Sequence, residues 1–422
     1  MLASVVALAC SGPEETREPS EPSEPEAPLR ADDERAPEPP PAEPAATSDP
    51  RPREEPAHAE PPAAPPGAPP APERGCAMAP PVRVAAGDWA SVAAIQGGFA
   101  IVTSAAEGDG EVVLVVRESG ETIARARLEH AVVRGHRRAA PAIAGSGGRL
   151  AVAIVDGRRR LLLTEVRAGA RGAELAFVPA GADVSLRIAP ALAPVGEGWA
   201  VAWTEEPAEG MRVRGGIFEG GALRAVRELR SDAGGAAAPA FVRGARDETI
   251  VFLEPRAGVS LAYRARASRS GFDDPTIARP INLVTEPPEL AAVRAGERDW
   301  IAYTAIGTAA TTAVGLAPLE GTAPPVPLVA GTGYGVLHVD GASLGGPAVL
   351  VADAPQGVDR DAPREVHVRV LDADGAPGAP AVVRGPGGAA SRGRVAAADG
   401  GTIGVTFTEG DAIYFALGRC AR

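Results

Sequence analysis

A 49-residue repeat constrains the fold of this chain more than any other feature of its sequence. Four segments, each a proline followed by three mainly apolar residues, begin at Pro141, Pro190, Pro239 and Pro288. Weaker copies of the segment begin near residues 91, 336 and 394. Three successive intervals of 49 residues are hard to obtain by accident, so we expect seven similar structural units.

A second segment follows the first within each unit and is typical of a buried β-strand. In Gly198–Glu205, Trp199 and Trp203 alternate with Ala200 and Ala202, which places large side chains on one face and small ones on the other. Sheets covered on both faces need side chains whose sizes interlock. A period near 50 residues made only of short strands predicts an all-β, seven-bladed β-propeller with four antiparallel strands in each blade.

The two ends of the repeat region complement each other. The last unit lacks a fourth strand, and a strand near residues 81–85 precedes the first unit and belongs to no other. Pairing the two would close the ring and remove its open edges. Cys76 precedes the extra strand and Cys420 follows its expected partner, which predicts a disulfide in an exported protein; two unpaired thiols are the alternative. The propeller domain is therefore expected over residues 76–422.

Residues 1–10 are apolar and end in Cys10, preceded by Ala9 and followed by Ser11. This pattern resembles the lipobox of bacterial lipoproteins, although the basic n-region is missing and the h-region is short. The resemblance implies a signal segment, a lipid on Cys10, and an exported protein anchored to a membrane. Its expected location is the outer membrane, the periplasm or the cell surface. An ordinary secretory signal and a chance apolar start are the alternatives.

Residues 11–75 differ in composition from everything that follows. They hold 16 acidic residues against 6 arginines, and so carry 10 of the 12 net negative charges of the chain. Many prolines and few apolar residues predict a disordered, extended tether; a proline-rich ligand for a partner is the alternative. The remaining body is close to neutral, which argues against a nucleic-acid groove. All 42 basic residues are arginine, which excludes lysine-based Schiff-base or P-loop chemistry.

A carboxylate follows the second strand in five of the seven units. These residues are Asp156, Glu205, Glu254, Asp353 and Glu409. In a propeller the corresponding turns share one rim, so the sequence predicts an acidic ring that binds a protein or other cationic partner. The alternative is that Asp and Glu simply end strands well.

The first strands of the units should line the channel and are mostly apolar. The polar exceptions are Arg243, Glu289, His338, Asp340 and Arg394. His338 and Asp340 are two residues apart on one strand, so both could point into the channel. A metal site or an acid–base site needs more converging groups than this. We therefore predict no catalytic residue, no metal site and no cofactor.

The strand pattern resembles sialidase-like and Kelch-like propellers. The whole chain resembles uncharacterised β-propeller-bearing lipoproteins of Gram-negative bacteria. The diagnostic motifs are absent: there is no Ser-x-Asp-x-Gly-x-x-Trp box, no paired Gly-His and Trp-Asp, and no Kelch double glycine. The resemblance thus implies a fold and no activity. We expect a non-enzymatic binding or scaffold module at the cell envelope; the alternative is a channel-site enzyme such as a glycoside hydrolase or lactonase.

Overall fold

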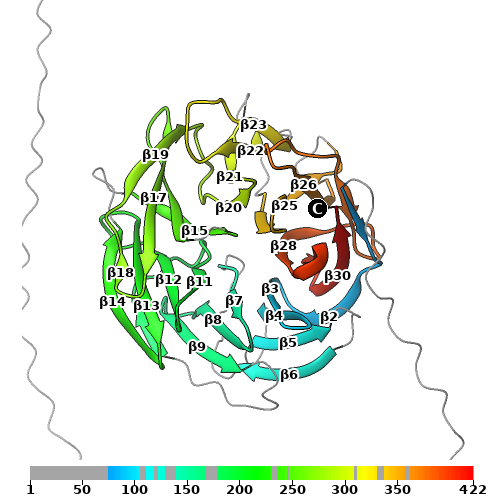
Figure 1. Ribbon diagram of the computed structural model, residues 1–422, viewed down its shortest axis with the longest axis horizontal. Coiled ribbons are helices and arrows are strands. Elements are labelled where there is room, and N and C mark those ends of the chain that lie inside the picture. The colour runs from blue at the N-terminus through cyan, green and yellow to red at the C-terminus, as the bar shows by residue number, and fades with distance from the viewer. Residues whose placement is uncertain are drawn as a thin grey trace, which may run out of the picture. The chain divides into compact units, whose positions relative to one another are not determined.

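The computed structural model describes residues 75–104, 111–117, 122–128, 139–167, 178–229, 235–244, 247–307, 311–329, 337–357 and 362–421. All of them belong to one compact unit, Pro62–Arg422. They form strands arranged as a ring of seven blades around a channel (Figure 1). Residues 1–74, which include the lipobox segment and nearly all of the expected tether, lie outside the described residues. No helix long and apolar enough to cross a membrane occurs in the described part of the chain.

The first three blades consist of consecutive strands. They are β3 (Trp89–Ile95), β4 (Gly98–Ser104), β5 (Glu111–Arg117) and β6 (Thr122–Leu128); β7 (Ala142–Ser146), β8 (Arg149–Val155), β9 (Leu161–Arg167) and β10 (Val178–Gly181); and β11 (Ala191–Val195), β12 (Gly198–Glu205), β13 (Arg212–Glu219) and β14 (Ala222–Leu229). Neighbouring strands within each blade are antiparallel. The first strand of each blade lies nearest the channel (Figure 1).

Blades four to six continue the pattern. They are β15 (Ala237–Arg243), β16 (Glu248–Glu254) and β17 (Ser260–Ser268), with β18 (Gly271–Phe272) and β19 (Thr276–Ile281) both paired to β17; β20 (Leu290–Ala295), β21 (Arg298–Ile306), β22 (Thr312–Pro318) and β23 (Val326–Val329); and β24 (Val339–Ser343), β25 (Ala348–Pro355), β26 (Arg364–Leu371) and β27 (Ala381–Val383). The inner strands β15 and β20 also touch in a short parallel ladder.

Blade seven is built from both ends of the described chain. It contains β28 (Ser391–Ala397), a 3-10 turn (Asp399–Gly401), β29 (Thr402–Glu409) and β30 (Ala412–Cys420), completed by β1 (Cys76–Met78) and β2 (Val82–Ala86). Both N-terminal strands pair antiparallel with β30. Cys76 lies opposite Cys420 in this ladder and forms a disulfide with it, with the two Cα atoms 4.0 Å apart. The predicted fold class and the predicted disulfide are confirmed.

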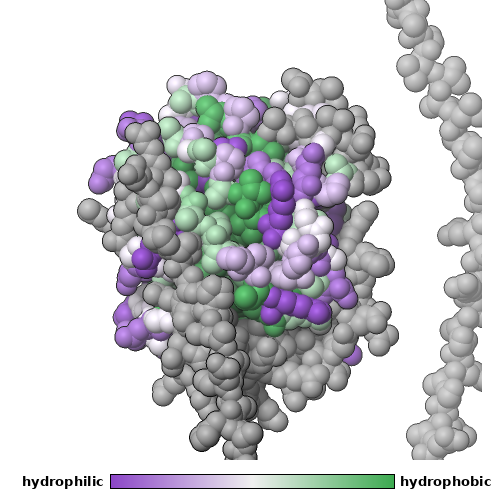
Figure 2. All heavy atoms as spheres, turned by 90° about the vertical axis from the view of Figure 1, so that its right-hand side faces the viewer, coloured by the Kyte–Doolittle hydropathy of each residue, from purple (hydrophilic) through white to green (hydrophobic). Residues whose placement is uncertain are grey.

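Packing between blades depends on the alternation of large and small side chains in β12, all of whose residues are buried. Trp199 and Trp203 pack towards blade two, in a cluster that includes Leu163. Ala200 and Ala202 face blade four, whose aromatic side chains fill the space that small residues leave. On the side of the ring shown in Figure 2, hydrophobic and hydrophilic surface residues are interspersed. Trp199 and Trp203 are fully buried and are thus enclosed between blades two and three.

Candidate functional site

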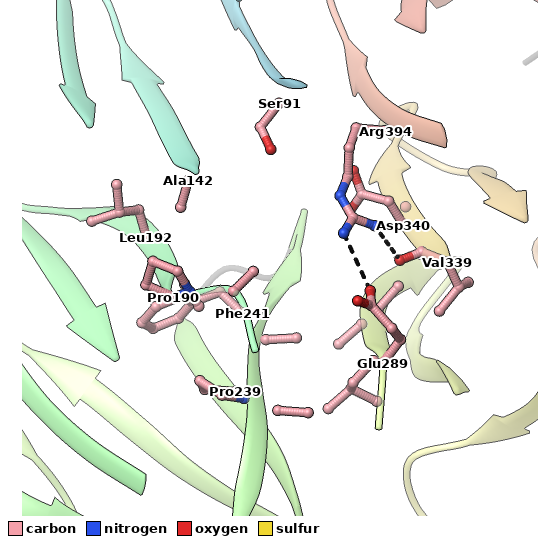
Figure 3. Close-up of a pocket in the computed structure, with 18 of the residues that line it drawn as sticks. Ser91, Ala142, Pro190, Leu192, Pro239, Phe241, Glu289, Val339, Asp340 and Arg394 are labelled. Carbon is pink, nitrogen blue, oxygen red and sulfur yellow. Dashed lines mark hydrogen bonds and ion pairs between the residues drawn. The ribbon is translucent and has the colours of Figure 1, made fainter. Parts of the chain in front are cut away.

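The channel wall has an apolar half and a polar half around a cavity of about 100 Å³. Blades two to four supply the apolar half, with Ala142, Pro190, Leu192, Pro239 and Phe241 (Figure 3). Blades five to seven supply the polar half, with Glu289, Asp340 and Arg394 (Figure 3). Arg243 and Ser91 also line this cavity. The seven inner strands are therefore equivalent in backbone position but not in chemistry.

A buried ionic cluster joins three blades at the polar half. Arg394 donates a hydrogen bond from Nη2 to Glu289 Oε2 at 3.2 Å, and another from Nη1 to the Val339 carbonyl at 3.1 Å. His338 Nδ1 lies 3.3 Å from Glu289 Oε1. The side chains of Arg394, Glu289 and His338 are only 9%, 13% and 8% exposed. Of the polar residues predicted for the channel, these three are the ones that meet.

Electrostatics make this cluster an ion pair rather than an acid–base device. Burial raises the pKa of Glu289, but the charge of Arg394 and the contact with His338 outweigh it and hold that pKa below its ordinary value. Burial lowers the pKa of Arg394, but the carboxylates of Glu289, Asp340 and Asp353 raise it by more than burial lowers it. The pKa of Arg394 is therefore raised overall. Glu289 is therefore a poor proton donor at neutral pH.

Asp340 and His338 are two residues apart in sequence, but their side chains make different contacts. Asp340 Oδ2 accepts a hydrogen bond from the backbone N–H of Val395 at 2.9 Å. This bond connects inner strands β24 and β28. His338 and Asp340 therefore do not form a pair of converging groups.

A larger pocket, of about 460 Å³, shares Glu289 with the channel cavity. Its lining also includes Trp89, Arg187, Glu286, His338, Arg364, Ala389, Ser391, Arg392, Thr408 and Glu409. We call it the rim pocket. Among the polar lining residues, only Glu289, His338 and Glu409 were candidates from the sequence. Trp89 and Arg392 were missed because each lies just before the start of a repeat unit as the sequence defines it.

Trp89 is buried and lies beside Arg392 and His338 of the rim pocket and beside Arg394 of the channel cavity. The Arg392 guanidinium carbon lies 4.6 Å from the centre of the indole ring, and that of Arg394 lies 5.7 Å from it. The His338 ring meets the indole edge-on, with ring centres 4.8 Å apart. Arg392 Nη1 also donates to the Asp88 carbonyl at 2.6 Å. Cation–π contacts of this kind fix the positions of both guanidinium groups.

The acidic residues predicted at the strand ends are found there, but four of the five are buried. Asp156, Glu205, Glu254 and Asp353 are 4%, 3%, 0% and 0% exposed, and Glu409 is half-buried. Three of them pair with an arginine: Asp156 with Arg160 at 2.7 Å, Glu205 with Arg212 at 2.9 Å, and Glu254 with Arg256 at 2.5 Å. Their charges are therefore matched within the blade.

The other two carboxylates accept backbone hydrogen bonds. Asp353 accepts from the N–H groups of Arg392 and Gly393, at 3.0 and 3.3 Å, and so fastens blade six to blade seven. Glu409 accepts from Gly387 and Ala389, at 3.0 and 2.9 Å. Recognition of a cationic partner by the five residues stays a prediction. No cluster of three or more His, Cys, Asp or Glu side chains that could hold a metal occurs among the described residues.

Fold and pocket together define a β-propeller with a polar cavity beside its channel. No protein-family model and no curated protein sequence matches the chain. Among solved structures, it is similar to the BP39L lectin from Burkholderia pseudomallei, at 14% identity and a TM-score of 0.56, over 80% of this chain and 97% of the lectin. It is also similar to the WD40 domain of Toxoplasma gondii coronin, at 10% identity and a TM-score of 0.52, over 84% and 89% of the two chains. At these identities the similarity concerns the fold.

Proposed function

We propose that this protein is a non-enzymatic binding module that holds a small polar ligand in the rim pocket. The observation that carries the proposal is the pocket itself. Its volume of about 460 Å³ lies within the range of small-molecule sites. Its wall combines charged groups with the hydroxyls of Ser391 and Thr408, which suit a ligand that forms several directional hydrogen bonds. The lectin of similar fold is a precedent for binding by this architecture.

The chemistry of the pocket favours binding over catalysis. A glycoside hydrolase needs a carboxylic acid with a raised pKa facing a second carboxylate. Glu289 instead has a lowered pKa, and Glu409 accepts two backbone hydrogen bonds. The Ser391 hydroxyl lies 3.2 Å from the Thr408 hydroxyl, and so it pairs with another hydroxyl rather than with a base. The enzyme alternative therefore has less support than the binding module.

The test is a ligand screen with a variant that fills the pocket. Calorimetry of the full chain against monosaccharides, oligosaccharides, amino acids and short peptides should find a saturable ligand. Ala389→Trp should abolish its binding, because Ala389 lines the pocket. Ala222→Trp, at an exposed position on β14, is the matched control and should bind normally. A screen without ligands, or binding that survives Ala389→Trp, would refute the proposal, and turnover of a bound probe would favour the enzyme.

We further propose, from the sequence, that Cys10 carries a lipid and that residues 11–75 separate the propeller from a membrane. The support is the lipobox-like segment and the acidic, proline-rich composition that follows it. This arrangement would present the binding module at the outer membrane or the cell surface.

A further inference from the structure

Arg392 of the rim pocket differs from Arg394 of the neighbouring channel cavity and from Arg187 of the same pocket. Arg394 pairs with Glu289, and Arg187 donates to Glu206 at 3.1 Å. Arg392 has no carboxylate within 4.0 Å among the described residues; the carboxylates of Asp88 and Asp353 act on it only from further away. Burial lowers its pKa, although the guanidinium stays charged. The pocket wall thus contains a half-buried cation with no ion-pair partner within 4.0 Å in the described part of the chain.

The backbone conformation at Arg392 does not require an arginine side chain. Arg392 has a φ of 59°, and the β28–β29 ladder skips from Ser391 to Arg394 around it. In blade four the β15–β16 ladder skips from Ala237 to Ala240, and Ala238 between them has a φ of 54°. The same β-bulge therefore carries alanine in one blade and arginine in another. Such bulges re-aim a side chain, and in blade seven that side chain is a cation lining the rim pocket.

The surrounding charges limit what Arg392 can bind. Arg187 and Arg364 also line the pocket, together with the three carboxylates of Glu286, Glu289 and Glu409. A ligand group with one negative charge can match Arg392, whereas a dianion such as phosphate would be repelled by these carboxylates. A planar carboxylate also suits the fork of an arginine. Resting on the proposed function, we propose that Arg392 recognises a carboxylate, and that the ligand of the rim pocket is a small carboxylic acid such as an acidic sugar or the C-terminus of a peptide.

The indole resonance of Trp89 can report on Arg392, because the guanidinium lies on that ring. The full chain, labelled with ¹⁵N, is titrated with D-glucuronate and with N-acetylglycine, each also as its neutral methyl ester. The Trp89 signal, assigned with Trp89→Phe, should shift and saturate with the acids. The esters should bind at least ten-fold more weakly, as expected when a charge-assisted hydrogen bond is lost.

Two variants test the residue itself. Arg392→Ala copies the residue found at the equivalent bulge in blade four and should weaken acid binding by about ten- to a hundred-fold. Arg392→Lys keeps the positive charge without the planar fork of the guanidinium, so its affinity for the acids should lie between those of the wild type and of Arg392→Ala. Arg224→Ala, at a side chain 62% exposed on β14, is the matched control and should not change affinity. Unchanged indole signals of Trp199, Trp203 and Trp300 show that each variant is folded.

The outcomes separate this inference from the proposed function. Preference for glucuronate supports an acidic sugar, and preference for N-acetylglycine supports a peptide C-terminus. Esters that bind as tightly as acids, or acid binding that survives Arg392→Ala, would overturn the inference while leaving the pocket as a binding site. So would inorganic phosphate or sulfate binding more tightly than either acid. If neither acid shifts Trp89 while the ligand screen succeeds, the inference alone fails; if the screen also fails, so does the proposed function.

Discussion

Reduction of the Cys76–Cys420 disulfide should cost the ring a measurable part of its stability. The bond joins residues 344 positions apart. In the chain-entropy model, a cross-link over a loop of this length stabilises the native state by about 6 kcal/mol. Pairing of β1 and β2 with β30 closes the ring independently of the sulfur atoms. That pairing remains after reduction, but the unfolded chain regains the entropy that the cross-link had removed.

The magnitude can be converted into a melting temperature. Unfolding entropy grows with chain length, so for a ring of this size about 6 kcal/mol corresponds to a decrease of roughly 8 °C in Tm. The assay is thermal and guanidinium denaturation of the wild type, with and without reductant, beside the double variant Cys76→Ser and Cys420→Ser. Cys10→Ser is the control and should respond to reductant as the wild type does.

Two results would contradict this reasoning. A decrease in Tm below about 1 °C would show that strand pairing alone accounts for closure. A variant that melts in two separate transitions would show that blade seven unfolds independently, so that the disulfide does not stabilise the ring as one unit.

Three further predictions concern single residues. Glu289→Ala leaves Arg394 buried without its acceptor and should cost about 3–5 kcal/mol in urea unfolding; because the folded-state pKa of Glu289 is lowered, this stabilisation is present above about pH 4.5 and should disappear as pH falls further. Burial raises the pKa of Glu248 to about 7, and the charge of Arg243 opposes this shift. The free energy of unfolding should therefore fall as pH rises from about 4.5 through 7, by at most about 3 kcal/mol before solvent screening. Glu248→Gln should flatten the plot of unfolding free energy against pH in that range. Cys10→Ala should abolish incorporation of a radioactive fatty acid in the native host, and equal labelling of the variant would contradict lipidation.

The architecture was predictable because its physical causes are local and repeated. Trp199 and Ala200 show their faces through alternation alone, and an apolar strand recurs at the corresponding place along the repeat. The position of Cys76 relative to Cys420 followed from the missing strand of the last unit. A regular period reports on packing between neighbouring blades, since each blade must present matching faces on both sides.

The chemistry of the candidate site was much less predictable. The carboxylate of Glu205 was visible as a strand-end residue, but its partner Arg212 is defined by the register of the next strand. Trp89 and Arg392 are far apart in sequence and meet only because the ring closes. Whether a charged residue is matched or unmatched depends on contacts of this kind, which no spacing rule reveals.

Departures from the repeat, rather than the repeat itself, indicate where ligand binding should be sought. Ala240 of blade four occupies the ladder position that Arg394 has in blade seven, and Ala238 that of Arg392. Equivalent backbone positions tolerate such exchanges, so the wall of the channel can change while each blade keeps its packing. Glu289, Asp340 and Arg394 lie on blades five to seven, and in blade seven Arg392 also donates a hydrogen bond to the Asp88 carbonyl just before blade one. The polar half of the channel therefore depends on blade seven being held beside blade one, which is the effect of the closing strands.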